Sequence, residues 1–213
     1  MNKDIEVELK FQVLDEAQIR EFVKNLNFIT RKRIVDKYLD TENADLYKKG
    51  LFIRIRDDKI LDFKYNLEDK ECKHEHCEEH SFPLPLTVDS LGSVNRICSI
   101  LSLNIFVNPD IGDFMTRNNL TVSITNDKTR EIYRDEKFEF CFDDVKNFGK
   151  FIEIETHATK EDDLEKIKDM MRERVRELKL KLITVGYNEL YWKKHNAEIY
   201  KQGKYHLEED KVN

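Results

Sequence analysis

The sequence has few glycines and prolines and no long apolar run. Its 6 glycines form neither GxGxxG nor GxxxxGK[ST], so the two common glycine-rich phosphate loops are excluded. No segment approaches the roughly 18–20 apolar residues of a membrane span, and the charged amino terminus has no signal-peptide core. These absences favour a soluble protein without a membrane partner, and we expect it to be cytoplasmic.

Cysteine is also scarce, and positive charge is not in excess. Four cysteines, at uneven spacing, are too few for a disulfide scaffold, so we expect reduced thiols. Cys98 and Cys141 each lie among apolar residues, which predicts buried core positions. A total of 37 Lys and Arg against 43 Asp and Glu gives a net charge of −6, which argues against a nucleic-acid partner.

Short segments that alternate apolar and charged residues dominate the chain. This alternation predicts strands with one apolar and one charged face. The segments are 5–11, 34–40, 51–56, 61–65, 120–125, 129–133, 136–143 and 151–155. Apolar residues at helical spacing predict helices over 15–28, 88–103, 159–178 and 187–195. Together they predict one mostly antiparallel α+β domain over 1–195, followed by a polar C-terminal tail over 196–213 that we expect to be frayed.

The charges on the predicted strands are sorted by sign. The first strand carries Glu6, Glu8 and Lys10, and the last carries Glu153 and Glu155. The strands between them carry Arg54, Arg56, Lys64, Lys128 and Arg130. In an ordinary half-buried sheet such faces meet solvent. In a closed barrel they would line a lumen suited to a polyanion and a divalent metal, and the pattern alone leaves both interpretations open.

The order of these residues resembles the CYTH superfamily, the triphosphate tunnel metalloenzymes that include class IV adenylyl cyclases and thiamine triphosphatases. The matching motifs are Glu6-x-Glu8-x-Lys10, Asp36-x-Tyr38-x-Asp40, Arg54-x-Arg56, Lys64, Lys128-x-Arg130, Asp143-Asp144-Val145, Glu153-x-Glu155 and Tyr187. The resemblance implies a closed eight-stranded antiparallel β-barrel, or tunnel, with helices packed outside.

The resemblance also implies roles for individual residues. It makes Glu6, Glu8 and Lys10 catalytic. The metal ligands, for Mg²⁺ or Mn²⁺, would be Glu6, Glu8, Glu153 and Glu155. The triphosphate ligands would be Lys10, Arg54, Arg56, Lys64, Lys128 and Arg130. Six cations in one lumen would repel one another, so we expect that an Arg54→Ala/Arg56→Ala double variant does not melt lower than the parent protein.

We therefore expect a metal-dependent phosphohydrolase whose substrate is tripolyphosphate, ATP or thiamine triphosphate. The alternatives are a class IV-type adenylyl cyclase that makes cyclic AMP, and a non-catalytic polyphosphate or nucleotide binder. The absence of a His-Phe pair near the first motif favours hydrolysis over cyclisation. The Cys- and His-rich segment 72–80 departs from the family and is either a polar edge strand or loop, or a Zn²⁺ site. The sequence leaves open whether the protein is a monomer or a homodimer.

Overall fold

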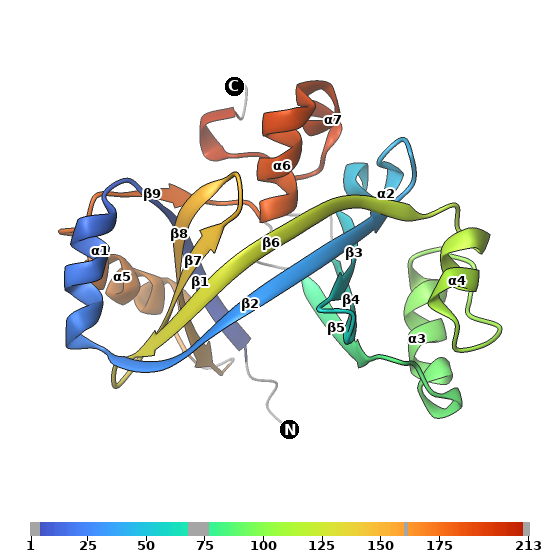
Figure 1. Cartoon of the computed structure of the whole chain (residues 1–213), viewed down its shortest axis with the longest axis horizontal. Coiled ribbons are helices and arrows are strands. Elements are labelled where there is room, and N and C mark those ends of the chain that lie inside the picture. The colour runs from blue at the N-terminus through green and yellow to red at the C-terminus, as the bar shows by residue number, and fades with distance from the viewer. Residues whose placement is uncertain (1–4, 68–76, 160–161, 211–213) are drawn as a thin grey trace. The chain divides into compact units, whose positions relative to one another are not determined.

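The structure, a computed structural model, describes residues 5–67, 77–159 and 162–210, with side chains from Val7 onward. Nine strands form one sheet in the order β5-β4-β3-β2-β6-β7-β8-β1-β9 (Figure 1). Their bounds are β1 Ile5–Val13, β2 Asn27–Asp40, β3 Leu51–Arg56, β4 Ile60–Tyr65, β5 Glu78–Pro83, β6 Thr121–Arg134, β7 Glu139–Val145, β8 Gly149–Ala158 and β9 Leu180–Ile183. Every pair for which a register is defined is antiparallel, which confirms the predicted strand arrangement.

The sheet differs from the expected eight-stranded closed barrel. It has a ninth strand, β9, which pairs with the end of β1 from Lys10 to Val13. Because a strand has two hydrogen-bonding edges, β8 and β9 together occupy both edges of β1 there. The order ends at β5 and β9, and no ladder within the described ranges joins these two strands.

The chain divides into two compact units. Unit 1 contains Met1–Ile34 and Asp127–Thr184, and unit 2 contains Val35–Asn126 and Val185–Asn213. The long strands β2 and β6 contribute residues to both units. No helix in the described part of the chain is long and apolar enough to span a membrane.

The core of unit 1 forms between one face of its strands and the helices α1 (Glu16–Phe22) and α5 (Leu164–Val175) (Figure 1). The side chain of Asp15 accepts hydrogen bonds from the first amides of α1 and so fixes where that helix begins. The predicted helix over 15–28 ends early, because a 3₁₀ turn (Val23–Asn25) leads directly into β2. The core residues from the strands include Val7, Leu9, Phe11, Phe140, Phe142, Ile152 and Ile154. Their charged neighbours along each strand therefore point to the opposite face.

Unit 2 packs the apolar face of β3 and β4 against α3 (Val88–Ile100) and α4 (Ile111–Arg117). Thr87 and Ser90 form a capping box that starts α3. The alternation in β3 buries Ile53 and Ile55 and turns Arg54 and Arg56 to the other side. Helix α4 was not predicted, because its seven residues give too short a helical pattern.

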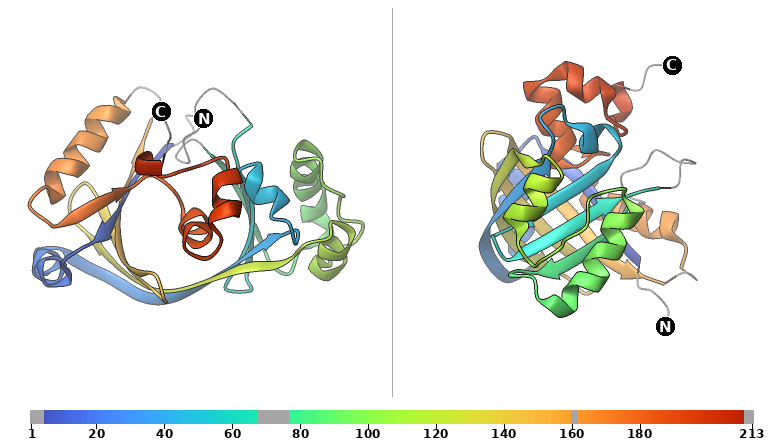
Figure 2. Two further views of the ribbon diagram at one scale, coloured as in Figure 1. Left: turned by 90° about the horizontal axis from the view of Figure 1, so that it is seen from above. Right: turned by 90° about the vertical axis from the view of Figure 1, so that its right-hand side faces the viewer.

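The C-terminal segment has helices and buried side chains up to Asp210, so for these residues the expectation of a frayed tail was wrong. It contains α6 (Tyr187–His195), α7 (Ala197–Gln202) and a 3₁₀ turn (Glu208–Asp210). Figure 2 shows α7 beside α2 (Asp45–Lys48). Tyr205 is buried and stacks on Phe52, with ring centroids 6.1 Å apart. Anchoring by this aromatic residue is not visible in a polar sequence, and the proposed boundary at residue 195 stays a prediction.

Gly203 lies so close to Tyr47 that a side chain there has no space. A Cβ atom on Gly203 would be 2.5 Å from the hydroxyl oxygen of the buried Tyr47. We expect Gly203→Ala to lower the free energy of unfolding by about 1–3 kcal/mol through overpacking. The matched control is Gly92→Ala in α3, where a Cβ meets nothing within 4 Å, and this change should stabilise by about 0.5–1 kcal/mol. Chemical denaturation measures both, and equal effects would contradict the packing of the C-terminal segment.

Candidate functional site

Charged side chains gather on the face of β1 and β8 that lies opposite the core of unit 1. Glu8 stands across from Glu155, and Lys10 stands across from Glu153. Residues directly opposite each other in a ladder share a face. Three of the four predicted metal ligands, Glu8, Glu153 and Glu155, are therefore brought together. Glu6 lies in the same strand opposite His157, but its side chain is outside the described part of the structure.

The two predicted phosphate ligands of β6 are held by one carboxylate of β7. Asp143, with no exposed surface, accepts a hydrogen bond from Lys128 Nζ at 2.6 Å. It also accepts two from Arg130, through Nε and Nη2, both at 2.7 Å. Asp143 was not among the predicted site residues, although its place in the alternation of β7 was a signal for this face. A bidentate contact of this kind fixes the plane of the guanidinium group.

Lys10 and Arg130 also contact the predicted metal ligands. Lys10 Nζ is 3.4 Å from Glu8 Oε1 and 3.0 Å from Glu153 Oε1. Arg130 contacts Glu153 through Nη2, and its Nη1 is 3.6 Å from Glu155 Oε1. Burial disfavours the charge on Glu153, but Lys10, Lys128 and Arg130 outweigh that effect and hold the pKa of Glu153 far below its usual range. Glu153 is thus a carboxylate at neutral pH.

Cys141 is buried, as predicted, but it belongs to the charged face and not to the apolar core. Its neighbours Phe140 and Phe142 point to the core, so the thiol points the other way. Burial raises the pKa of Cys141; Arg130 opposes this effect, and nearby carboxylates add to it. One ligand atom each from Glu139, Cys141 and Glu155 lie within 4.8 Å of one another.

The donors on this face fit a hard divalent cation. Glu8, Glu139, Glu153 and Glu155 occupy two neighbouring rungs of the β1–β8–β7 ladders. Carboxylate oxygens are the protein ligands that Mg²⁺ and Mn²⁺ prefer, whereas a thiol is a soft donor. Glu139 was not among the predicted ligands. The cross-strand position of Glu139, opposite Glu155, makes it a further candidate.

Unit 2 has its own charged face, on β2, β3 and β4. Arg54 donates to Asp62 at 3.0 and 2.8 Å, and Arg56 donates to Asp36 at 2.8 and 3.3 Å. Lys64 forms an ion pair with Glu79 at 2.7 Å. Asp36 and Asp62 are only 1% and 4% exposed. The expectation of uncompensated repulsion among these cations was therefore wrong, because each has a carboxylate partner on a neighbouring strand.

The Cys- and His-rich segment is only partly described. Residues 72–76 lie outside the described ranges, and so does the Zn²⁺ site predicted there as one alternative. Residues 78–80 belong to β5, an end strand of the sheet. His80 stacks on Tyr65, with ring centroids 5.8 Å apart. For these three residues the edge-strand interpretation is confirmed.

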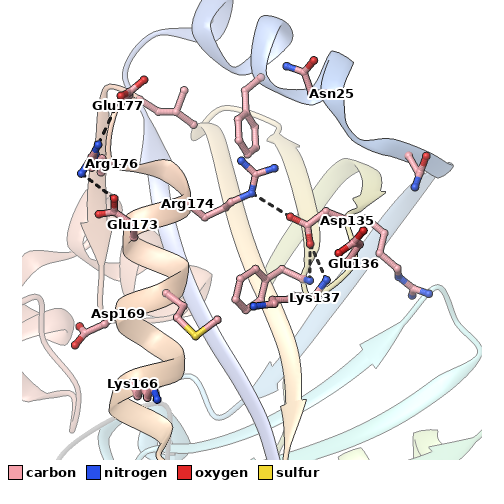
Figure 3. Close-up of a pocket in the computed structure, with 16 residues that line it drawn as sticks. Asn25, Asp135, Glu136, Lys137, Lys166, Asp169, Glu173, Arg174, Arg176 and Glu177 are labelled. Carbon is pink, nitrogen blue, oxygen red and sulfur yellow. Dashed lines mark hydrogen bonds and ion pairs between the residues drawn. The ribbon is translucent and has the colours of Figure 1, made fainter.

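A hollow of about 1170 Å³ in unit 1 contains none of the predicted site residues. It lies between α5 and the turn from β6 to β7 (Figure 3). Figure 3 shows Asp135 accepting a hydrogen bond from Arg174, at 3.0 Å, and two from backbone amides. Acidic and basic side chains line the hollow in equal numbers, so it has no preference for a polyanion.

The model of the CYTH domain family matches residues 4–186. The chain belongs to the CYTH family. This match confirms the resemblance to the triphosphate tunnel metalloenzymes. Members of that family are triphosphatases or adenylyl cyclases and depend on divalent metal. No curated protein matches the sequence significantly.

Solved structures with similar folds support the same assignment of fold. PH1819 from Pyrococcus horikoshii OT3 is 22% identical with a TM-score of 0.64, over 89% of this chain and 99% of that chain. HpAC1 from Hippeastrum, described as an adenylyl cyclase candidate with a dominant triphosphatase activity, is 17% identical with a TM-score of 0.59, over 90% and 96%. An adenylate cyclase candidate from Vibrio parahaemolyticus is 19% identical with a TM-score of 0.57, over 88% and 97%. At these identities the likeness shows the fold alone.

The ion pairs of unit 2 reverse the expectation for the Arg54→Ala/Arg56→Ala variant. The double variant would leave the buried carboxylates of Asp36 and Asp62 without their guanidinium partners. We therefore expect the free energy of unfolding to fall by about 3–5 kcal/mol. The control removes two exposed arginines, Arg172 in α5 and Arg176 just after it, whose partners Asp169 and Glu173 are also exposed. That change should cost about 1 kcal/mol or less. Thermal melting without ligand decides: a double variant as stable as the parent would restore the repulsion interpretation.

Proposed function

We propose that the protein is a divalent-metal-dependent phosphohydrolase that acts on inorganic or small organic triphosphates. One observation carries the proposal. On a single face of unit 1, three carboxylates suited to metal lie within ion-pair distance of two cations suited to phosphate oxygens. Those residues are Glu8, Glu153 and Glu155, with Lys10 and Arg130. Phosphoryl transfer needs both kinds of group close together, because its catalysis is mainly charge neutralisation and positioning.

Each group has a definite task in this proposal. Glu6, Glu8, Glu153 and Glu155 hold Mg²⁺ or Mn²⁺, which when bound activates water and neutralises charge on the phosphates. Lys10 and Arg130 bind phosphate oxygens, and Asp143 keeps the guanidinium group of Arg130 and the ammonium group of Lys128 in place. By the family resemblance, Arg54, Arg56 and Lys64 are further phosphate ligands.

Hydrolysis is preferred to cyclisation for two reasons. The sequence lacks the His-Phe pair that some class IV cyclases carry near the first motif. HpAC1, which shares the fold, is described with a dominant triphosphatase activity. An adenylyl cyclase remains the second candidate, because the fold relative from Vibrio is described as an adenylate cyclase candidate.

A substrate panel tests the function. We expect release of orthophosphate from at least one of tripolyphosphate, ATP and thiamine triphosphate with Mg²⁺ or Mn²⁺, and none in excess EDTA. Excess Ca²⁺ should inhibit, because it prefers a larger and looser coordination than Mg²⁺. Cyclic AMP and pyrophosphate from ATP would select the cyclase. Tight binding of tripolyphosphate without turnover under any metal would select a non-catalytic binder.

Glu8→Gln tests whether Glu8 takes part in catalysis or is only a solvated carboxylate. The change keeps the size of the side chain and removes the charge, so we expect kcat to fall about 100-fold or more while the fold persists. Glu16→Gln is the control, since Glu16 lies in α1 and pairs with Lys150 at 2.7 Å, away from the predicted ligands. Its activity should be that of the parent protein. Wild-type rates in both variants would contradict the proposed metal site.

A further inference from the structure

On the charged face of unit 1, ion pairs connect residues that are proposed to bind the metal with residues that are proposed to bind phosphate. Glu8, Glu153 and Glu155 are proposed metal ligands, and each lies against Lys10 or Arg130. Lys10 and Arg130 are proposed phosphate ligands. Every proposed metal ligand whose side chain the structure describes is therefore in contact with a cation that the triphosphate requires.

These contacts are largely buried, so an unpaired charge at any of these positions would be unfavourable. The side chains of Lys10 and Arg130 are 11% and 14% exposed, and that of Glu153 is 6% exposed. Removing one partner of a buried pair leaves a desolvated charge and is strongly unfavourable. A divalent cation that binds these carboxylates must therefore compete with Lys10 and Arg130.

The anchoring of Arg130 limits how far that side chain moves when it loses the contact. Asp143 binds Nε and Nη2 of Arg130, whereas Nη1 faces Glu155. The edge that Asp143 holds fixes the position of the guanidinium group. The remaining donors can then exchange a carboxylate for a phosphate oxygen while the guanidinium group and the backbone stay in place.

We propose that Lys10 and Arg130 are exchangeable counter-ions. In the ligand-free protein they neutralise Glu8, Glu153 and Glu155; when a divalent cation takes those carboxylates, the two side chains are released to the phosphate oxygens. Metal and triphosphate then bind with positive coupling, because each ligand removes the partner with which the other competes. This inference rests on the proposed function, from which it takes its two ligands.

Binding of Mn²⁺ in the absence of phosphate tests the exchange directly. Removing a competing cation should tighten metal binding, so we expect Lys10→Gln and Arg130→Gln each to lower the Kd for Mn²⁺ about 10-fold, measured from the electron paramagnetic resonance signal of free Mn²⁺. Arg33→Gln is the control, because it makes the same charge change in unit 1 while Arg33 pairs with Asp127 at 2.8 Å. Its Kd should match that of the parent protein.

Coupling provides a second readout. Isothermal titration gives the affinity for tripolyphosphate with and without saturating Mn²⁺. We expect the ratio of these affinities to be larger in the parent protein and in Arg33→Gln than in Lys10→Gln or Arg130→Gln. Complexation of Mn²⁺ by tripolyphosphate in solution contributes equally to every variant, so differences in the ratio report on the protein.

The outcomes separate this inference from the proposed function. Mn²⁺ binding in Lys10→Gln and Arg130→Gln that is no tighter than in the parent protein, or equally tightened in Arg33→Gln, overturns the exchange even if the parent protein hydrolyses triphosphates. Tighter Mn²⁺ binding with reduced coupling supports the exchange even if no substrate is hydrolysed, and then only the proposed function fails. Lys10→Gln keeps the test decisive if Arg130→Gln does not fold.

Discussion

Ion pairs between neighbouring strands are the interaction on which both charged faces depend. A guanidinium or ammonium group at these partly buried positions is stable only beside an anion, and in the pairs with Asp36, Asp62 and Asp143 the anion comes from the adjacent strand. Asp143 on β7 serves Lys128 and Arg130 of β6, whereas Asp62 on β4 and Asp36 on β2 serve arginines of β3. The antiparallel register decides which carboxylate meets which cation, so it also decides which charges the protein can keep out of water.

A site that neutralises its own charges has a cost and a benefit for binding. The disadvantage is that an incoming polyanion must displace the carboxylates that already contact the cations it would bind. The benefit is that the cations are held in place before the ligand arrives, so little side-chain entropy is lost on binding. Where a metal becomes the alternative partner of the carboxylate, as proposed for Glu153, the free energy of metal binding offsets part of the free energy needed to separate the carboxylate from its cation. Binding energy is then available for the transition state instead of for ordering side chains.

The sequence was sufficient to predict on which face of a strand each side chain lies, but not which side chains contact one another across strands. Alternation placed Glu8, Lys10 and Glu153 on one side of β1 and β8, because side-chain direction follows local geometry. It could not show that Asp143 holds Arg130, since that contact depends on the register of the β6–β7 pair. Cys141 was misjudged because its sequence neighbours are apolar but point the other way. The order of the C-terminal segment depends on Tyr205 stacking against Phe52, a contact between residues distant in sequence.

The pairing of charges differs between the two faces, and this difference bears on where a metal belongs. On the unit 2 face, opposite charges stand across from each other: Asp36 from Arg56, Arg54 from Asp62 and Lys64 from Glu79. On the unit 1 face, Glu155 stands between two carboxylates, Glu8 on β1 and Glu139 on β7. Like charges directly opposite each other are destabilising, and a divalent cation bound among these three carboxylates would relieve the repulsion. The cross-strand carboxylates therefore favour a metal on unit 1.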